Sequence, residues 1–211
     1  MDRTVIDEKR KDKIPYEYNK ELFKQFDPIK MSENTGCVYD NCKNEFMVKL
    51  MESLYIVKFP TGEVLFGDYS EIISYPIKTL ILRYLMNAKG APTSNKNITY
   101  REVPGGNLYY KVFYGRCISR LAGTFGNRLD KFKDVLQKLG AQEVKMGDIA
   151  YKFEFVNNVY VTFVLWGGDE EFPASAQILF DANISSYFTV EDMAVIGDIS
   201  IGKITKLSFA G

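Results

Sequence analysis

The sequence predicts an α+β fold in which an antiparallel sheet, made of one hairpin and a C-terminal meander, packs with several helices. Apolar residues at helical spacing and runs of β-branched and aromatic residues occupy separate stretches, whereas a parallel α/β sheet would alternate them. The expected C-terminal strands also follow one another directly along the chain. Finally, 211 residues, of which 46% are hydrophobic and 26% charged, are typical of a globular chain with its own core.

The first thirty residues are denser in charge than the rest of the chain. They contain one short amphipathic run, residues 16–26, with its apolar residues on one helical stripe. Asp27-Pro28 ends this run, because the residue before a proline avoids the helical conformation. We therefore expect residues 1–30 to form a charged N-terminal extension with a short helix, and residues 31–211 to form a single α+β domain.

A hairpin and a helix are expected in the first half of this domain. Residues 54–59 and 63–66 are β-rich and are joined by Pro60-Thr61-Gly62, a short turn typical of a hairpin. Residues 46–54, just before, predict a strand or an irregular strand. In residues 75–89 the apolar side chains recur at helical spacing, with a proline near the start and a glycine after the end.

Two helices are expected in the middle of the chain. Residues 108–125 have helical periodicity, although two glycines weaken the prediction. Residues 128–139 carry one clear apolar stripe, and Gly140 supplies the C-terminal cap. In the first of these helices, the residues expected to face the core are Leu108, Val112, Cys117, Ile118 and Leu121.

The C-terminal part changes to a period of two. Residues 150–155, 160–166 and 175–180 are rich in β-branched and aromatic residues, and Asn157-Asn158 makes a tight turn between the first two. These strands predict a consecutive antiparallel meander. The segment Thr189 to Asp192 is typical of a capping box and begins a final helix.

The chain contains no histidine, and this absence excludes several classes of chemistry. Without an imidazole there is no Ser-His-Asp triad, no Cys-His couple and no His-ligated metal. The three cysteines, Cys37, Cys42 and Cys117, are too few for a four-thiolate zinc or iron–sulphur site. Free thiols are expected, and the role of Cys37 and Cys42 stays open.

Charge and hydropathy bear on partners and location. The 27 basic and 27 acidic residues give a net charge of zero, so no positive excess indicates nucleic acid or an anionic membrane. The apolar runs are shorter than the ~20 residues of a membrane span, and the N-terminus lacks a signal-peptide core. We expect a cytoplasmic protein without nucleic-acid or membrane partners, whose oligomeric state the sequence leaves open.

The loop 167–173, between two expected strands, holds three neighbouring carboxylates. They are Asp169, Glu170 and Glu171. Such a group could bind a hard cation, raise the pKa of one carboxyl for acid–base catalysis, or accept hydrogen bonds from arginine. The structural alternative is a solvated hairpin tip. Trp166 and Phe172 flank the carboxylates, and bulky aromatics can hold such groups in a partly dry cleft.

Two features upstream of the loop could contact an anion. The adjacent glycines of Pro104-Gly105-Gly106 precede a helix and could expose N–H groups to an anion, but a plain turn is the alternative. Arg116 lies among aromatic residues, so a buried guanidinium there would need a carboxylate partner in a structural ion pair. The partners considered are Glu102, Asp148, Asp169 and Asp181.

The order of several short motifs resembles a known family. They are Arg101-Glu102-Val103-Pro104-Gly105-Gly106, Tyr114-Gly115-Arg116, Phe125-Gly126, Leu139-Gly140, Gly147-Asp148-Ile149-Ala150, residues 165–173, Ile178-Leu179-Phe180-Asp181 and Glu191-Asp192. Together they resemble the domain of unknown function 3786 family, from about Phe46 to about Ile204. The resemblance implies a protein of anaerobic bacteria or archaea with no settled activity. Relatives fused to a four-cysteine iron–sulphur module imply a link to corrinoid or one-carbon metabolism, although this chain lacks that module.

These features predict one cleft at an end of the meander that binds a small ligand or cofactor. The candidate ligand-binding residues are Glu102, Gly105, Gly106, Arg116, Trp166, Asp169, Glu170, Glu171, Phe172 and Asp181. Binding or an accessory role is the first hypothesis, because no nucleophile–base pair is recognisable. One alternative is an enzyme that uses Asp169 or Glu171 as general acid or base, with or without a divalent cation. The other is a protein-docking module, for which Trp166 and Phe172 would be exposed. The sequence assigns no cofactor and no metal ligands.

Overall fold

The computed structural model describes residues 10–209, and the chain divides after Ala91 into two compact units, Met1–Ala91 and Pro92–Gly211. Residues 1–9 of the expected N-terminal extension lie outside the described part. The predicted α+β class is confirmed, because helices and antiparallel strands occupy separate segments of the chain. Among the described helices, none is both long enough and apolar enough to cross a membrane.

Within residues 10–91, the first unit contains a small antiparallel sheet and three helices. Its strands are β1 (Val38–Asp40), β2 (Glu45–Leu50), β3 (Ser53–Lys58) and β4 (Glu63–Phe66), each paired with the next. Its helices are α2 (Lys13–Phe23), α3 (Pro28–Thr35) and α4 (Tyr75–Asn87). The expected hairpin is confirmed, with Lys58 opposite Glu63 at its turn. Asp27 accepts hydrogen bonds from the N–H groups of Ile29 and Lys30, so Pro28 begins a helix that the sequence analysis did not predict.

The second unit is built on the predicted meander. Its strands are β5 (Asn97–Thr99), β6 (Gln142–Glu143), β7 (Ile149–Val156), β8 (Val159–Trp166) and β9 (Ser175–Asp181). Strands β7, β8 and β9 pair consecutively, β5 joins the outer edge of β9, and β6 pairs with β7. At the tight turn between β7 and β8, Asn158 has φ of 65°, a conformation that asparagine tolerates well.

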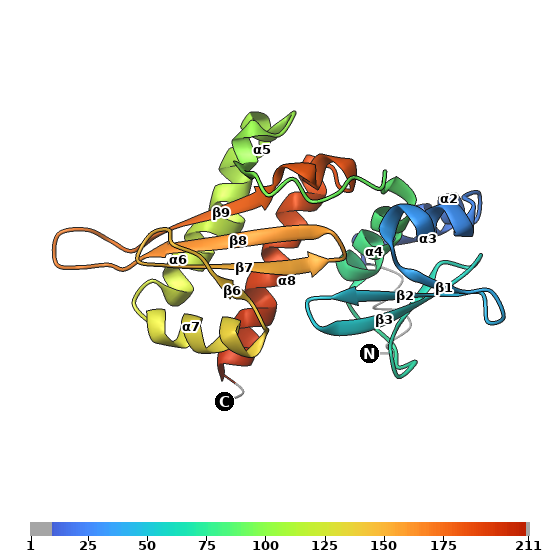
Figure 1. Cartoon of the computed structure of the whole chain (residues 1–211), viewed down its shortest axis with the longest axis horizontal. Helices are drawn as coiled ribbons and strands as arrows, with labels where there is room; N and C mark the ends of the chain where they lie inside the picture. Colours follow the sequence, from blue (N-terminus) through green and yellow to red (C-terminus); the bar gives the residue numbers. More distant parts are fainter. Residues whose placement is uncertain (1–9, 210–211) are drawn as a thin grey trace. The chain divides into compact units, whose positions relative to one another are not determined.

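Helices accompany this sheet. They are η1 (Tyr100–Glu102), α5 (Gly106–Phe113), η2 (Tyr114–Ile118), α6 (Ser119–Phe125), α7 (Leu129–Lys138), η3 (Ala182–Ser186) and α8 (Val190–Phe209). Helix α8 passes behind β7, β8 and β9 (Figure 1). Its predicted capping box is confirmed, since the Thr189 N–H donates to the Asp192 carboxylate at 3.0 Å. Helices α5 and α6 are continuous through the π-helical turn η2.

The prediction of the core-facing side is wrong at the start of this continuous helix. Leu108 and Val112 were expected to face the core but are 79% and 64% exposed. Phe113 is buried instead, and its ring stacks on Tyr100 with a centroid distance of 3.9 Å. Because a π-helical turn widens the helical repeat, a stripe drawn with one constant period does not cross η2 correctly. The three other residues expected in the core are buried: Cys117, Ile118 and Leu121.

Candidate functional site

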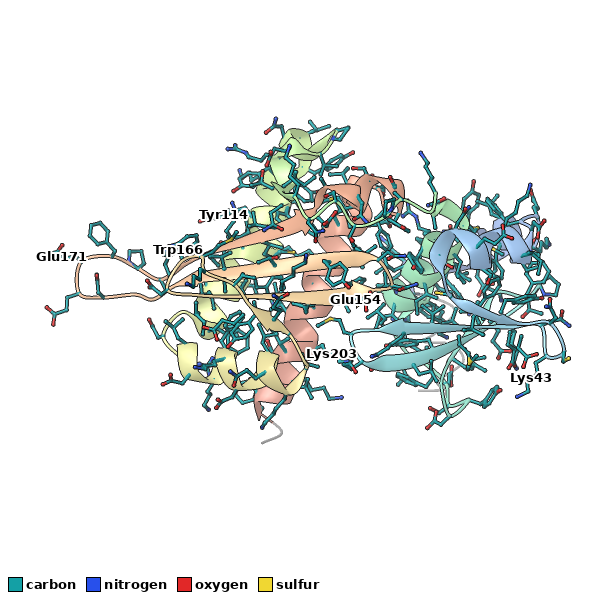
Figure 2. All side chains as sticks on the ribbon, in the orientation of Figure 1. Lys43, Tyr114, Glu154, Trp166, Glu171 and Lys203 are labelled. Carbon is teal, nitrogen blue, oxygen red and sulfur yellow. The ribbon has the colours of Figure 1, made fainter. Side chains whose placement is uncertain are left out.

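The acidic loop joins β8 to β9 and extends well beyond the ends of both strands (Figure 1). We call residues 167–174 the hairpin tip. Asp169 holds its turn together: its carboxylate accepts from the N–H groups of Glu171 and Phe172 at 2.9 and 2.7 Å. The Asp169 N–H in turn donates to the carbonyl of Phe172 at 2.9 Å. Glu170 and Glu171 are exposed, and Glu171 points away from the rest of the protein at the far end of the loop (Figure 2).

The same hydrogen bonds determine the acidity of Asp169. Backbone N–H donation from Phe172 and then from Glu171 lowers the pKa of this carboxyl below its ordinary value. A carboxyl that acts as a general acid near neutral pH needs a raised pKa. Asp169 is therefore suited to preserving the shape of the loop as an ionised acceptor.

The two aromatic residues of this region differ in their surroundings. Trp166, at the end of β8, is 40% exposed and lies beside Gly147, where an added Cβ would be 3.3 Å from its ring. Asp148 secures the base of the loop by accepting from the Gly167 N–H at 2.7 Å. Phe172 is 66% exposed at the tip. The structure thus anchors the base of the loop and presents a phenyl ring to solvent.

A shallow hollow of about 330 Å³ lies between the hairpin tip and the end of α6. Its lining residues are Ala122, Gly123, Asn127, Gly168, Asp169, Phe172, Pro173 and Ala174. Gly126 allows this close approach, because an added Cβ there would lie 2.2 Å from the Cβ of Ala174. Of the ten candidate residues, the hollow brings together Asp169 and Phe172. Sequence reasoning did not select Asn127, whose only signal was its position beside a glycine before α7.

Glu102, Gly105 and Gly106 have local structural roles. The carboxylate of Glu102 accepts from the N–H and hydroxyl of Thr99 at 2.7 and 2.8 Å, and these bonds lower its pKa. Gly105 has φ of +83°, which favours glycine in a turn. At Gly106 an added Cβ would lie 1.8 Å from the carbonyl oxygen of Tyr100. Backbone geometry alone accounts for both glycines, as the plain-turn alternative predicts.

Arg116 does form an ion pair, but with none of the four carboxylates considered from the sequence. It bonds to Asp198 of α8 at 2.7 Å, and Arg120 bonds to the same carboxylate. The Arg116 side chain is partly exposed, so the ion pair does not serve a buried guanidinium. The reason is that η2 packs against α8, which brings a residue 82 positions away within reach.

Asp181 lies at the other end of β9 from the hairpin tip and is 2% exposed. Its carboxylate accepts from the N–H and hydroxyl of Ser94 at 2.9 and 2.7 Å, from Asn95 N–H at 2.8 Å, and from Asn183 N–H at 3.0 Å. Burial by itself raises the pKa of Asp181, but these hydrogen bonds outweigh it and the net shift is downward. Asp181 therefore holds Ser94 and Asn95, in the segment before β5, against the end of β9.

Among residues 10–209, no group of three or more His, Cys, Asp or Glu side chains is placed to hold a metal ion. The three loop carboxylates accordingly do not converge on one point. Cys42 is exposed, whereas Cys37 and Cys117 are buried. Burial, followed by the nearby charge of Asp198, raises the pKa of Cys117 to about 12, so this thiol stays protonated at neutral pH.

Comparison with known proteins gives one family. Residues 27–203 match the model of the family described as Domain of unknown function (DUF3786), which confirms the resemblance found from the motifs. No curated protein and no solved structure matches the chain. The matched range includes all ten candidate residues.

Proposed function

The chain belongs to the DUF3786 family, and from this premise we propose that it is an accessory protein that docks on a partner protein through its hairpin tip. Phe172 carries the proposal, because its ring is 66% exposed on a loop that extends beyond the sheet. Burying an apolar side chain contributes about 25 cal/mol per Å² removed from water. Exposed aromatic anchors are typical of residues that dominate interfaces.

The charges around the ring indicate the chemistry of the partner. Glu170 and Glu171 directly precede Phe172 and are exposed. The expected partner surface is an apolar socket bordered by lysine or arginine, since complementary charge favours encounter and fixes orientation. Asp169 already orders the turn by three hydrogen bonds, which reduces the conformational entropy lost on binding.

Photo-crosslinking tests this docking role. With benzoylphenylalanine in place of Phe172, we expect irradiation in an extract of the source cells to give a discrete protein adduct. Excess unlabelled wild-type protein should suppress the adduct, whereas unlabelled Phe172→Ser protein should compete at least about tenfold less well, because it lacks the buried ring. The measurement is adduct yield, with the captured protein identified by mass spectrometry.

Ile73 provides the matched control for this experiment, because it is 68% exposed and lies in the first unit. Benzoylphenylalanine at position 73 should not capture the same protein. The docking role would be abandoned if Phe172→Ser competed as well as wild type, or if both positions gave the same adduct.

The hollow favours a second candidate, the binding of a small polar ligand. Its volume of about 330 Å³ is at the lower end of ligand sites, which run from roughly 300 to 1,000 Å³. Asn127 and Asp169 provide polar groups and Phe172 provides an apolar wall. The link to corrinoid or one-carbon metabolism that the resemblance implies makes folates the first compounds to try, and only part of a cobalamin would fit in a hollow of this volume.

A thermal-shift panel of cobalamins, folates, nucleotides and divalent ions tests the hollow. A ligand at 100 times its Kd stabilises the native state by about 2.7 kcal/mol, so we expect the Tm to rise by several degrees. The shift should disappear in Asn127→Ala and persist in Asn107→Ala, an exposed asparagine away from the hollow. If no compound raises the Tm, or if the Tm shift persists in Asn127→Ala, the hollow is not a ligand site.

A further inference from the structure

The continuous helix α5–η2–α6 has an exposed side that lies opposite its core-facing side. Its buried residues include Phe113, Cys117, Leu121 and Phe125. On the opposite side, exposed residues recur every three or four positions, and we call them the outer face: Leu108, Val112, Gly115, Ser119 and Gly123. The helix has 20 residues and is about 30 Å long. Within residues 10–209, this side of the helix leaves two large apolar side chains, Leu108 and Val112, exposed to water.

Side-chain size changes along the outer face. Leu108 and Val112, near the start, are large and strongly exposed. At Gly115 and Gly123, no described atom lies within 4 Å of where a Cβ would be. An identical helix running antiparallel would set Leu108 against Gly123 and Val112 against Ser119, with Gly115 near the two-fold axis. Such an interface is self-complementary, because each contact occurs twice under two-fold symmetry.

Charge differs between the start of this helix and the hairpin tip beside its end. Lys111 in α5 and Arg101 in the preceding η1 are exposed cations, the latter over the Tyr110 ring at 4.2 Å. The positive end of the α5 dipole adds to them. Between the two ends, Arg116 and Arg120 share the carboxylate of Asp198. The end of α6 lies beside the acidic hairpin tip, since Gly123 and Asp169 line the same hollow. An antiparallel copy therefore brings acidic residues to basic ones, whereas a parallel copy would bring like charges together.

We propose that the hairpin tip docks on a second copy of this chain, with the two outer faces antiparallel and each Phe172 against the α5 of the other copy. This inference rests on the docking role proposed above and names its partner. A stable interface buries about 800 Å² per partner, which is more than a single helix face provides. The hairpin tip supplies the additional surface, because it lies next to one end of the outer face and extends away from its own sheet (Figure 1).

Analytical ultracentrifugation gives the first test. Wild-type protein should sediment as a dimer, and Gly123→Trp should be monomeric, because the indole fills the notch that receives Leu108. Lys133→Trp, on the exposed side of α7, is the control and should remain dimeric. Lys111→Glu should weaken the dimer about tenfold, because it places two negative charges opposite each other. Adding Glu171→Lys in the same chain should restore the dimer, because residues 111 and 171 of opposite copies then again carry opposite charges.

Disulfide formation between copies tests the direction of pairing. The background is Cys42→Ser, since Cys42 is the exposed native thiol. Mixing a Leu108→Cys chain with a Gly123→Cys chain should give a mixed disulfide under mild oxidation. The Leu108→Cys chain alone should give little dimer, because the two positions 108 lie at opposite ends of an antiparallel pair. Circular dichroism of each variant checks that it is folded.

Three outcomes would overturn the inference: a wild-type monomer at tens of micromolar, a dimer unaffected by Gly123→Trp, or efficient cross-linking of Leu108→Cys to itself. If one of these is found while benzoylphenylalanine at position 172 captures a different protein, docking stands and only the partner is wrong. If position 172 captures nothing specific either, the docking role falls as well.

Discussion

Replacing Gly106 with alanine is expected to destabilise the second unit by about 3 kcal/mol, the upper range of overpacking effects. The added Cβ would lie 1.8 Å from the Tyr100 carbonyl oxygen, 2.9 Å from its carbonyl carbon and 3.2 Å from Arg101 Cα. These are backbone atoms, so no rotamer change can remove the clash. The start of α5 would have to move away from η1, and Tyr100 would lose its stacking on Phe113.

Urea unfolding followed by circular dichroism measures this loss. Gly202→Ala is the matched control, because Gly202 lies within α8 and an added Cβ there would make only an ordinary contact at 3.6 Å. It should be neutral or stabilising by up to about 1 kcal/mol, since alanine has the higher helix propensity. If Gly106→Ala unfolded like wild type, close packing would not explain this glycine, and an anion-binding role for the turn would regain support.

Replacing Asp181 with alanine is expected to cost about 3 to 5 kcal/mol. The carboxylate is buried and accepts from three backbone N–H groups and the Ser94 hydroxyl. Alanine would leave these donors without their acceptor, and unsatisfied buried polar groups are costly. Asp181→Asn should cost less, because its one carbonyl oxygen still accepts part of the network. Asp134→Asn, on the exposed side of α7, should change the unfolding free energy little.

The contribution of Asp181 should also depend on pH. Its pKa is lower in the folded protein than in the unfolded chain, where aspartate titrates near pH ~3.9. The stabilisation is therefore complete above that pH and is lost as the pH falls through the folded-state value. The difference in unfolding free energy between wild type and Asp181→Asn should narrow as the pH falls from 6 towards 3. A constant difference across this range would show that the charge of Asp181 does not matter.

The candidate site was predictable only where its residues are close in sequence. Asp169 and Phe172 lie in one loop, so any folded form of that loop places them near each other. Glu102, Arg116 and Asp181 were assigned to the same cleft, but Glu102 bonds to the nearby Thr99, and the partners of the other two lie in distant segments. The types and spacing of Arg116 and Asp181 carried no information on which distant segments fold against them.

Residue types and spacing were enough to predict the elements whose causes are local: the hairpin of β3 and β4, the meander of β7 to β9, and the capping box that starts α8. In each, the deciding contacts join residues within one element or adjacent elements. The partner of Arg116, the downward pKa shift of Asp181 and the exposed side of α5 became apparent from the folded structure alone. These depend on contacts between distant segments and on a π-helical turn, and one-dimensional periodicity records neither.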